Sequence, residues 1–425
     1  MSILGFPMIK NILSHQVQSK LDVLDANFCI VLPDGQKINA QRKEGLTPTL
    51  MLTNWITLSH LAHGEIGLVA SDWVEGKLYF DGNMRELMDL AAQVIPFEPN
   101  QSQISMLGLL GNQLEHWRGR LRHRRAQSKL DVQSHYDVTD DFFSTWLDEK
   151  KVYSCAYFED DGSSLQAAQK AKLDLICRKL SLQANDRFLD VGMGWGALLF
   201  WAAEKYGVQA QGITLSVNQF EYVQRQIEAK GLSRQIKVRL LDYRDLDESE
   251  PFDKIASVGM FEHVGRANMS SYFEKIYRLL TPGGMVMNHG ITANGTGYRQ
   301  LGLGIGDFIE KYIFPGGELI HLSEVCSHMA QSRLELVDAE CLRPHYAKTL
   351  WAWSDRLESR LNQARAALSR SHGEQTDRIL RAYRLYLAGC AMGFERGWTS
   401  IYQILALRPS QTPLYPYRRE HMYAR

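Results

Sequence analysis

Apolar positions follow two alternating periods along the chain from about residue 165 onward. Helical spacing over Leu165–Leu180 is followed by a strand-like run at Arg187–Gly192, and this alternation then repeats. The further predicted strands are Val208–Thr214, Ile236–Leu241, Lys254–Met260 and Met285–Ile291, and the further predicted helices are Val217–Gly231 and Asn268–Leu280. Such βαβ alternation predicts an α/β fold with a mostly parallel sheet that helices cover on both faces.

The regular pattern is interrupted between Thr292 and Gly317, where glycine is dense. A long irregular segment of this kind predicts an insertion or lid over the strand ends. The pattern then resumes as strands Leu334–Leu342 and Ser400–Leu407 and helices Ala347–Arg370 and Gln375–Phe394.

The part before residue 131 has a different pattern. Residues 1–104 predict a small mixed α+β domain, with strands at Phe28–Leu32 and Lys77–Phe80 and helices at Leu52–His63 and Met84–Val94. Residues 105–130 predict a basic helical connector, and residues 131–425 the catalytic domain.

The connector is rich in arginine next to Trp117. Its basic residues are Arg118, Arg120, Arg122, Arg124 and Arg125. It is either a solvated helical linker or a contact with anionic lipid headgroups, in which each basic residue contributes about 1 kcal/mol. We expect it to help the N-terminal domain dock on a membrane, because Trp117 and Leu121 can anchor at the interface.

Composition narrows the function classes. A chain of 425 residues predicts more than one domain, and its 48 basic and 48 acidic residues give no net field for a polyanion, which disfavours nucleic acid. The six cysteines form no CxxC pair, which argues against a zinc site and fits a reducing cytosol. The uncharged stretch between Asp190 and Glu204 is too short to cross a bilayer, so we expect a cytoplasmic protein. If its substrate is a membrane lipid, the protein must reach that lipid from the aqueous side, at the inner face of the membrane.

A glycine motif marks the predicted cofactor site. The run Asp190-Val-Gly192-Met-Gly194-Trp-Gly196 lies at a strand-to-helix turn, where glycines allow a cofactor to approach the backbone. No GK[ST] follows it, and the second strand ends in GITLS, without the acid that holds a dinucleotide ribose. Asp242 follows the third strand instead, as in Rossmann-like methyltransferases. The pattern favours S-adenosylmethionine over a nicotinamide dinucleotide.

Longer motifs carry a more specific resemblance. They are HYDVTDDFFSTWLD from His135, YSCAYF from Tyr153, GMFEHVG from Gly259, KYIFPGG from Lys311 and LAGCAMGFERG from Leu387. From about residue 130 onward the chain resembles the cyclopropane fatty acid synthases and the mycolic acid cyclopropane synthases. The resemblance implies a Rossmann-like class I methyltransferase sheet with helical lid insertions.

The resemblance also implies a mechanism and its residues. A cis double bond takes the methyl group of S-adenosylmethionine, and a bound bicarbonate ion removes a proton as the ring closes. The implied catalytic residues are Cys155, Glu262, His289, the Ile291 backbone and Tyr346, with Cys390 as a weaker candidate whose helical position favours packing. The implied cofactor residues are Tyr153, Ser154, Asp190, Gly192, Gly194, Gly196, Thr214, Ser216, Gln219, Asp242, Tyr243 and Arg244.

Residue by residue, structural roles remain open. Cys155 fits a small buried apolar group, and His263 and His289 fit hydrogen-bonded core histidines. Glu262 follows the fourth strand, at the sheet edge where open α/β folds bind ligands, so its place favours function. Aromatic faces stabilise carbocations, and the candidates, which also fit the core, are Tyr153, Tyr157, Phe261, Tyr312 and Phe314.

The leading hypothesis is cyclopropanation of unsaturated acyl chains in membrane phospholipids, without metal or nucleic acid. Methylation without ring closure, a non-catalytic lipid-binding protein and a methyltransferase for small molecules or nucleic acid are the alternatives. The chain departs from the family at Met193, where cysteine is common, and in the segment after Ile291. Both the reaction outcome and a homodimer stay open at this point.

Overall fold

The computed structural model describes residues 5–40, 47–95, 138–296, 301–411 and 416–423. The chain forms two compact units. The first unit comprises residues 1–103, 299–314 and 353–398, and the second comprises residues 104–298, 315–352 and 399–425. The first unit thus takes in two segments of the range 131–425 that the sequence analysis assigned to one domain. The predicted connector, residues 105–130, lies outside the described residues.

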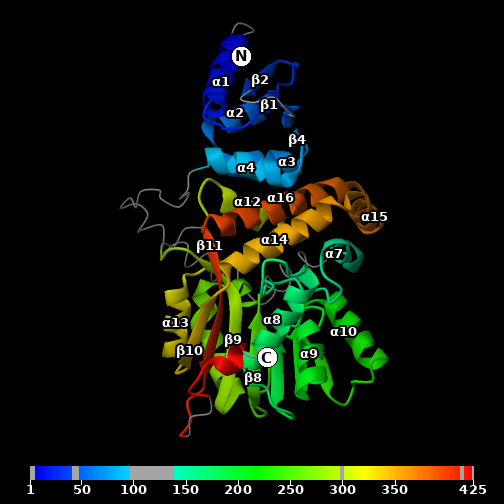
Figure 1. Ribbon diagram of the computed structural model, residues 1–425, viewed down its shortest axis with the longest axis vertical. Helices are drawn as coiled ribbons and strands as arrows, with labels where there is room; N and C mark the ends of the chain where they lie inside the picture. Colours follow the sequence, from blue (N-terminus) through cyan, green and yellow to red (C-terminus); the bar gives the residue numbers. More distant parts are fainter. Residues whose placement is uncertain (1–4, 41–46, 96–137, 297–300, 412–415, 424–425) are drawn as a thin grey trace. The chain divides into compact units, whose positions relative to one another are not determined.

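The second unit contains a seven-stranded sheet in the order β10-β11-β9-β8-β5-β6-β7 (Figure 1). The strands are β5 (Arg187–Val191), β6 (Gln209–Thr214), β7 (Ile236–Leu240), β8 (Phe252–Val258), β9 (Leu280–Ala293), β10 (Glu335–Cys341) and β11 (Thr399–Leu407). From β9 to β7 all neighbours are parallel, whereas β11 runs antiparallel to both β9 and β10. The predicted parallel sheet therefore has an antiparallel edge, and β9 begins earlier than predicted because it includes the TPGG turn.

Helices cover both faces of this sheet. The helices of the second unit are α7 (Asp140–Trp146), α8 (Leu165–Lys179), α9 (Ala197–Tyr206), α10 (Val217–Ala229), α11 (Met269–Leu279), α13 (Leu322–Gln331) and α17 (Glu420–Tyr423). Met285 and Met287 of β9 pack in one apolar core with α8, α9 and α10, while Val286 packs in the other with α11 and α13. Successive side chains of a strand face opposite sides, so β9 is buried on both.

The first unit is built around a four-stranded sheet in the order β2-β1-β3-β4. Its strands are β1 (Phe28–Val31), β2 (Lys37–Ala40), β3 (Thr49–Leu52) and β4 (Leu78–Asp81). Its helices are α1 (Gly5–Leu21), α2 (Trp55–His63), α3 (Ile66–Val74), α4 (Met84–Val94), α12 (Ile305–Tyr312), α15 (Leu361–His372) and α16 (Thr376–Glu395). Helix α2 starts later than predicted, because Leu52 belongs to β3 and Asn54 caps the helix by accepting a bond from the Ile56 amide at 2.8 Å.

The prediction of one helix over Ala347–Arg370 is wrong. The chain forms α14 (Arg343–Glu358) and then α15, with a break at Arg360. Arg360 leaves the helical region, with φ −130°, and its amide donates to the Leu357 carbonyl at 3.0 Å in a tightened last turn. The boundary between the two units falls within α14, after Ala352.

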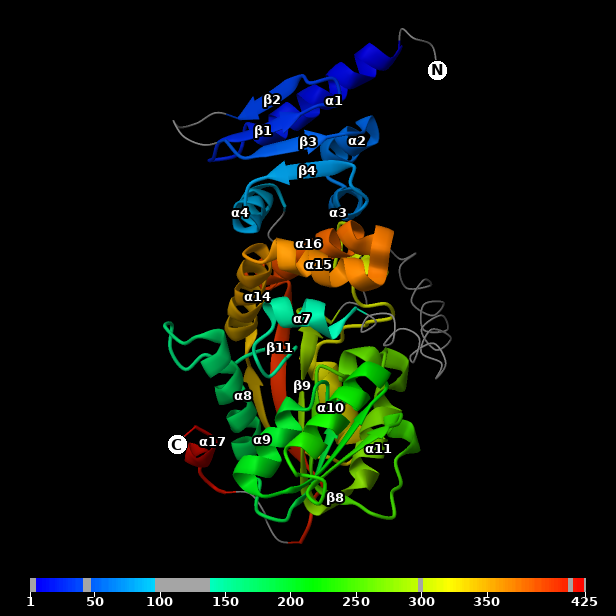
Figure 2. The same ribbon diagram turned by 90° about the vertical axis from the view of Figure 1, so that its right-hand side faces the viewer.

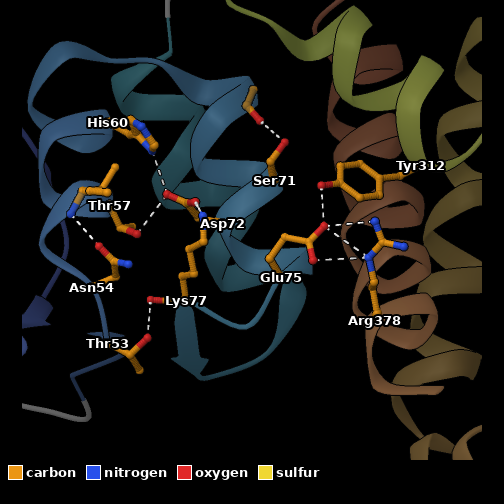
Figure 3. A network of polar contacts seen from close by, with 12 residues as sticks. Thr53, Asn54, Thr57, His60, Ser71, Asp72, Glu75, Lys77, Tyr312 and Arg378 are labelled. Atoms are coloured by element: carbon orange, nitrogen blue, oxygen red, sulfur yellow. Dashed lines mark hydrogen bonds and ion pairs between the residues drawn. The ribbon is translucent and has the colours of Figure 1, made fainter. Parts of the chain in front are cut away.

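A buried carboxylate organises the N-terminal part of the first unit (Figure 3). Asp72 of α3 is 2% exposed and accepts hydrogen bonds from Thr57 Oγ1 at 2.9 Å and Lys77 Nζ at 2.9 Å, and it lies 2.7 Å from His60 Nδ1. Burial alone would raise the pKa of Asp72, but the bonds from Lys77, His60 and Thr57 together hold it below its ordinary value. The charge of Asp72 therefore joins α2, α3 and the start of β4.

A second carboxylate ties α3 to the later helices of the same unit. Glu75 accepts hydrogen bonds from Tyr312 Oη of α12 at 2.9 Å and from Arg378 Nη2 of α16 at 3.1 Å (Figure 3). Trp73 Nε1 donates to the Arg381 carbonyl at 3.0 Å, and Arg381 Nε donates back to the Val74 carbonyl at 2.9 Å. These bonds explain why segments far apart in the sequence form one compact unit.

We predict that Asp72→Ala lowers the free energy of unfolding by about 2 kcal/mol, because buried donors at Thr57 and His60 lose their acceptor. Urea-induced unfolding measures this loss, with Asp89→Ala, an exposed aspartate of α4, as the matched control. The contribution of Asp72 to the free energy of unfolding is present above about pH 3.9, the ordinary pKa of aspartate. It is lost as the pH falls through the lowered pKa of Asp72 in the folded protein. Equal losses in the two variants would contradict the prediction.

Candidate active site

The glycine motif forms the turn between β5 and α9. Gly192, Gly194 and Gly196 have φ values of +82°, +55° and +81°, the left-handed region that glycine adopts without strain. The amides of Gly192 and Met193 both donate to the Ile213 carbonyl at 3.0 Å, which ties the turn to β6. A Cβ atom at Gly194 would meet nothing within 4 Å. The turn is thus held firmly and exposes open backbone where a ligand can approach.

This turn borders a pocket at the carboxyl ends of β5, β6, β7 and β8. The predicted cofactor residues that line it are Tyr153, Ser154, Asp190, Gly192, Gly194, Thr214, Gln219, Asp242, Tyr243 and Arg244. The other two serve the surrounding structure. The Ser216 side chain caps α10 by accepting a bond from the Gln219 amide at 3.3 Å, and a Cβ atom added at Gly196 would lie 3.0 Å from the Phe200 ring. The structure therefore brings most of the predicted cofactor residues to one cavity.

Asp242 is fixed at the mouth of this cavity. Its Oδ1 atom accepts hydrogen bonds from the Arg244 amide at 2.9 Å and from Arg244 Nε at 2.8 Å. The bond to Asp242 raises the pKa of the Arg244 guanidinium, so the pair stays charged. Asp242 is thus an oriented carboxylate that follows the third strand and lines the cavity.

Sequence analysis missed a buried cation at the base of the cavity. Lys172 of α8 is 2% exposed, lines the pocket and donates to Ser154 Oγ at 2.8 Å. Burial lowers the pKa of Lys172 to about 8, opposed by the nearby Cys155, Asp148 and Asp190, while burial raises the pKa of Asp190 to about 7, opposed by Lys172. A lysine between Ala171 and Leu173, on the apolar face of a predicted helix, was the signal that could have revealed it.

Glu262 lies in a short 3₁₀ turn (Phe261–His263) directly after β8. Its Oε1 accepts a hydrogen bond from the Ile291 amide of β9 at 2.7 Å, whereas its buried Oε2 has no partner among the described residues. Burial raises the pKa of Glu262 to about 7, and the bond from Ile291 opposes that rise. Met260, which directly precedes this turn, and His263, its last residue, both line the cofactor cavity. The Ile291 amide, which the family resemblance places next to a bound bicarbonate, donates to Glu262 and orients that carboxyl.

His289 precedes Ile291 by two positions on β9 and is 1% exposed. Its Nδ1 lies 3.3 Å from Gln403 Nε2, and its buried Nε2 has no partner within the described part of the chain. Burial, together with the charges of Lys172 and Lys179, holds the pKa of His289 well below its ordinary value. The imidazole is therefore neutral near pH 7.

The remaining predicted catalytic residues are divided between the units. Cys155 is fully buried in the second unit, donates through Sγ to the Ala156 carbonyl at 3.2 Å, and has its thiol pKa raised by burial. Tyr346 of α14 also belongs to the second unit and is 6% exposed. Cys390 lies on α16 of the first unit, where burial raises its thiol pKa to about 12. Neither thiol is set up as a thiolate nucleophile.

Of the predicted aromatic candidates, Tyr153 lines the cavity and Phe261 is buried beside Glu262. Tyr312 and Phe314 belong to the first unit, where Phe314 packs edge-on against Tyr386 at 5.6 Å. In the described residues, no cluster of three or more histidine, cysteine or acidic side chains is arranged to hold a metal ion. No helix among those residues is long and apolar enough to cross a membrane.

Comparisons with known proteins agree with this geometry. Residues 122–404 match the family model of mycolic acid cyclopropane synthetase. The chain is 40% identical over 377 residues to a probable fatty acid methyltransferase of Pseudomonas putida, covering 88% of this chain and 91% of that protein. It is 39% identical over 281 residues to cyclopropane mycolic acid synthase 1 of Mycobacterium tuberculosis, covering 64% and 95%. The solved structure of the mycolic acid cyclopropane synthase CmaA1 with SAH and CTAB superposes with a TM-score of 0.60 at 38% identity, covering 66% of this chain and 98% of that one.

We predict that Gly290→Ala disturbs the site, because a Cβ atom there would lie 2.0 Å from the Phe261 ring and 2.9 Å from Glu262 Oε1. Overpacking of this kind costs about 1–3 kcal/mol and would displace the Glu262 carboxyl from the Ile291 amide. Thermal unfolding measures the cost. The matched control is Gly295→Ala, where the added Cβ atom meets nothing within 4 Å. The close packing at Gly290 would be refuted by equal melting temperatures for the two variants.

Proposed function

Because the chain belongs to the mycolic acid cyclopropane synthetase family, we propose that it cyclopropanates unsaturated fatty acyl chains of membrane phospholipids. The predicted family and the predicted class I methyltransferase fold are confirmed, and the protein is an S-adenosylmethionine-dependent methyltransferase. One observation carries the finer proposal. Glu262 has an Oε2 atom without a partner among the described residues, and it lies in the chain between Met260 and His263, which both line the cavity.

The cavity suits S-adenosylmethionine as the methyl donor. The open backbone at Gly194 accommodates close approach of the cofactor, and Asp242 offers an oriented acceptor for hydroxyl groups. Lys172 at the buried base supplies a cation, with Asp190 as its counter-charge. The amino-acid end of S-adenosylmethionine is zwitterionic, and Lys172 and Asp190 together offer it both signs of charge. The relative CmaA1 was solved with SAH bound.

The chemistry proposed for this cavity is alkylation of a weak nucleophile. The π electrons of a cis double bond form a bond to the sulfonium methyl carbon, the carbon–sulfur bond breaks, and S-adenosylhomocysteine leaves. The resulting carbocation loses a proton from the transferred methyl group, and the freed electron pair closes the three-membered ring. Because an alkene is a poor nucleophile, the protein contributes mainly by alignment and by excluding water.

The residues around Glu262 fit a small anion such as bicarbonate. Glu262 with a pKa near 7 retains a proton in much of the population and can donate through Oε2, and neutral His289 can donate through Nε2. Buried polar atoms without a protein partner are costly unless a ligand pairs with them. Cys155 and Tyr346 are the further residues that we assign to this site. Bicarbonate bound there would supply the base that accepts the proton.

The extent of the matches favours ordinary fatty acyl chains over mycolic acids. The match to the mycolic acid synthase covers 64% of this chain but 95% of that protein's length. The family model begins to match only at residue 122, after residues 1–103 of the first unit. The fatty acid methyltransferase covers 88% of this chain. In the first unit α1 exposes Met8 and Ile12, at 69% and 50%, which supports docking on the inner face of a membrane.

A second candidate is acyl methylation without ring closure, favoured by the name of the Pseudomonas putida relative. The two reactions differ only in which carbon of the cation loses its proton. Incubation with S-adenosylmethionine, bicarbonate and vesicles of unsaturated phospholipid, followed by mass spectrometry and proton NMR of the acyl chains, separates them. A gain of one CH2 with cyclopropane ring protons supports the main proposal, whereas surviving olefinic protons support methylation. No gain, with the cofactor bound, would overturn both.

We predict that Glu262→Gln lowers kcat on such vesicles by about 100-fold, the usual size of a lost proton-transfer contribution. A glutamine amide can still donate a hydrogen bond to the anion, but unlike the carboxyl group it cannot exchange a proton with the anion that takes up the substrate proton. The Kd for S-adenosylmethionine should change little, since Glu262 itself does not line the cofactor cavity. Product formation over time and calorimetric titration give the two numbers, and Glu221→Gln on the exposed side of α10 is the control. Unchanged turnover in Glu262→Gln would remove this residue from the mechanism.

A further inference from the structure

A row of hydrogen-bonded polar side chains extends from His289 on the face of the sheet that α8 covers. Strand β11 lies beside β9 (Figure 2). Gln403 of β11 pairs directly with His289 of β9 in the antiparallel ladder, so their side chains lie on the same face of the sheet. Both are buried, Gln403 fully. Lys179, at the end of α8, is fully buried too and donates from Nζ to Gln403 Oε1 at 2.8 Å. Its ammonium also pairs with Glu340 of β10.

The order of donors and acceptors along this row has one consistent solution. An ammonium group has only donors, so the atom of the Gln403 amide that faces Lys179 must be the oxygen. The amide nitrogen of Gln403 then faces His289 Nδ1, at 3.3 Å. Since an NH2 group donates, Nδ1 must accept, and the single proton of a neutral imidazole then resides on Nε2.

We propose that Lys179 and Gln403 are positioning residues that fix His289 as the Nε2–H tautomer, leaving Nε2 as a hydrogen-bond donor for the reaction. The role in the reaction rests on the proposed function, but the tautomer itself does not. Nε2 is buried and has no partner among the described residues, which is the state of a donor kept for a bound group.

The presence of a lysine at position 179 supports this assignment. A buried ammonium is costly, and an apolar side chain of similar size at position 179 would pack the same core without that cost. Glu340, 22% exposed, offsets part of the cost, and attraction to it raises the pKa of Lys179 against the stronger lowering by burial. What an apolar residue would not do is dictate which end of the Gln403 amide faces His289.

The test is the protonation pattern of His289 by ¹⁵N NMR on the full-length protein labelled in histidine. The signals of His289 are identified as those that are missing from the spectrum of the His289→Gln variant. We expect Nε2 protonated and Nδ1 unprotonated in the wild type at neutral pH. Nδ1 protonated in the wild type would overturn the proposal, whatever the protein's activity, so this result and a failed lipid assay are separate outcomes.

Gln403→Glu tests the direction of the hydrogen bonds between Lys179, residue 403 and His289. A carboxylate accepts from both Lys179 and His289, so the proton should move to Nδ1. Turnover should then fall roughly 100-fold or more, as when a catalytic histidine is held in the wrong tautomer, with the Kd for S-adenosylmethionine unchanged. Two results in Gln403→Glu would refute the positioning role: a proton that remains on His289 Nε2, or full turnover although the proton has moved to Nδ1.

Lys179→Met provides a second variant in case Gln403→Glu does not fold. Without the ammonium the Gln403 amide is free to turn, and we expect His289 to give signals of both tautomers. The matched control is Lys170→Met, an exposed lysine on the same helix, which should leave the spectrum and the turnover unchanged. A single Nε2–H tautomer in Lys179→Met would show that Lys179 does not set it.

Discussion

Burial of side chains at the carboxyl ends of β8 and β9 determines the protonation states of Glu262 and His289. Burial penalises the charged form of a side chain, so Glu262 holds its proton up to about pH 7 and His289 stays neutral. Each of the two groups keeps one polar atom without a partner among the described residues. The same desolvation leaves the thiol of Cys155 protonated. Below about pH 7, Glu262 and His289 are therefore both neutral side chains with a buried polar atom left for a bound group.

The antiparallel edge of the sheet makes this arrangement possible. Because β11 pairs with β9 residue for residue, Gln403 lies directly opposite His289, and the side chains at 285 and 287 continue the same face into the apolar core under α8. On the following positions of β9, Gly290 leaves room for Phe261 and Glu262, and the Ile291 amide holds the carboxyl. The cofactor turn at the end of the neighbouring β5 completes the site. Strand register thus places the polar atoms, and packing determines their protonation.

Much of this was predictable from the sequence, for physical reasons that differ between elements. The central strands are long apolar runs with strong turn signals, and the glycine turn and Asp242 sit at positions that the fold requires, so all were predicted. Helix α1 was missed because its apolar residues, among them Met8 and Ile12, remain exposed and give no clear core-facing stripe. The packing of α12 and α16 with α3 rests on Glu75, Tyr312 and Arg378, which are far apart in the chain. Lys179 and Gln403 look like ordinary surface residues until tertiary structure buries them, whereas Lys172 could have been recognised by its place on the apolar face of α8.

The most direct test of this account is the pH titration of the Glu262 carboxyl itself, by infrared difference spectroscopy of the wild type against Glu262→Gln. The protonated carboxyl band that the substitution removes reports that one side chain. The account predicts half-protonation near pH 7, because the group is buried and only one of its oxygens is paired among the described residues. A midpoint near 4.5, the value of a solvated glutamate, would show that water reaches the site and would contradict the account.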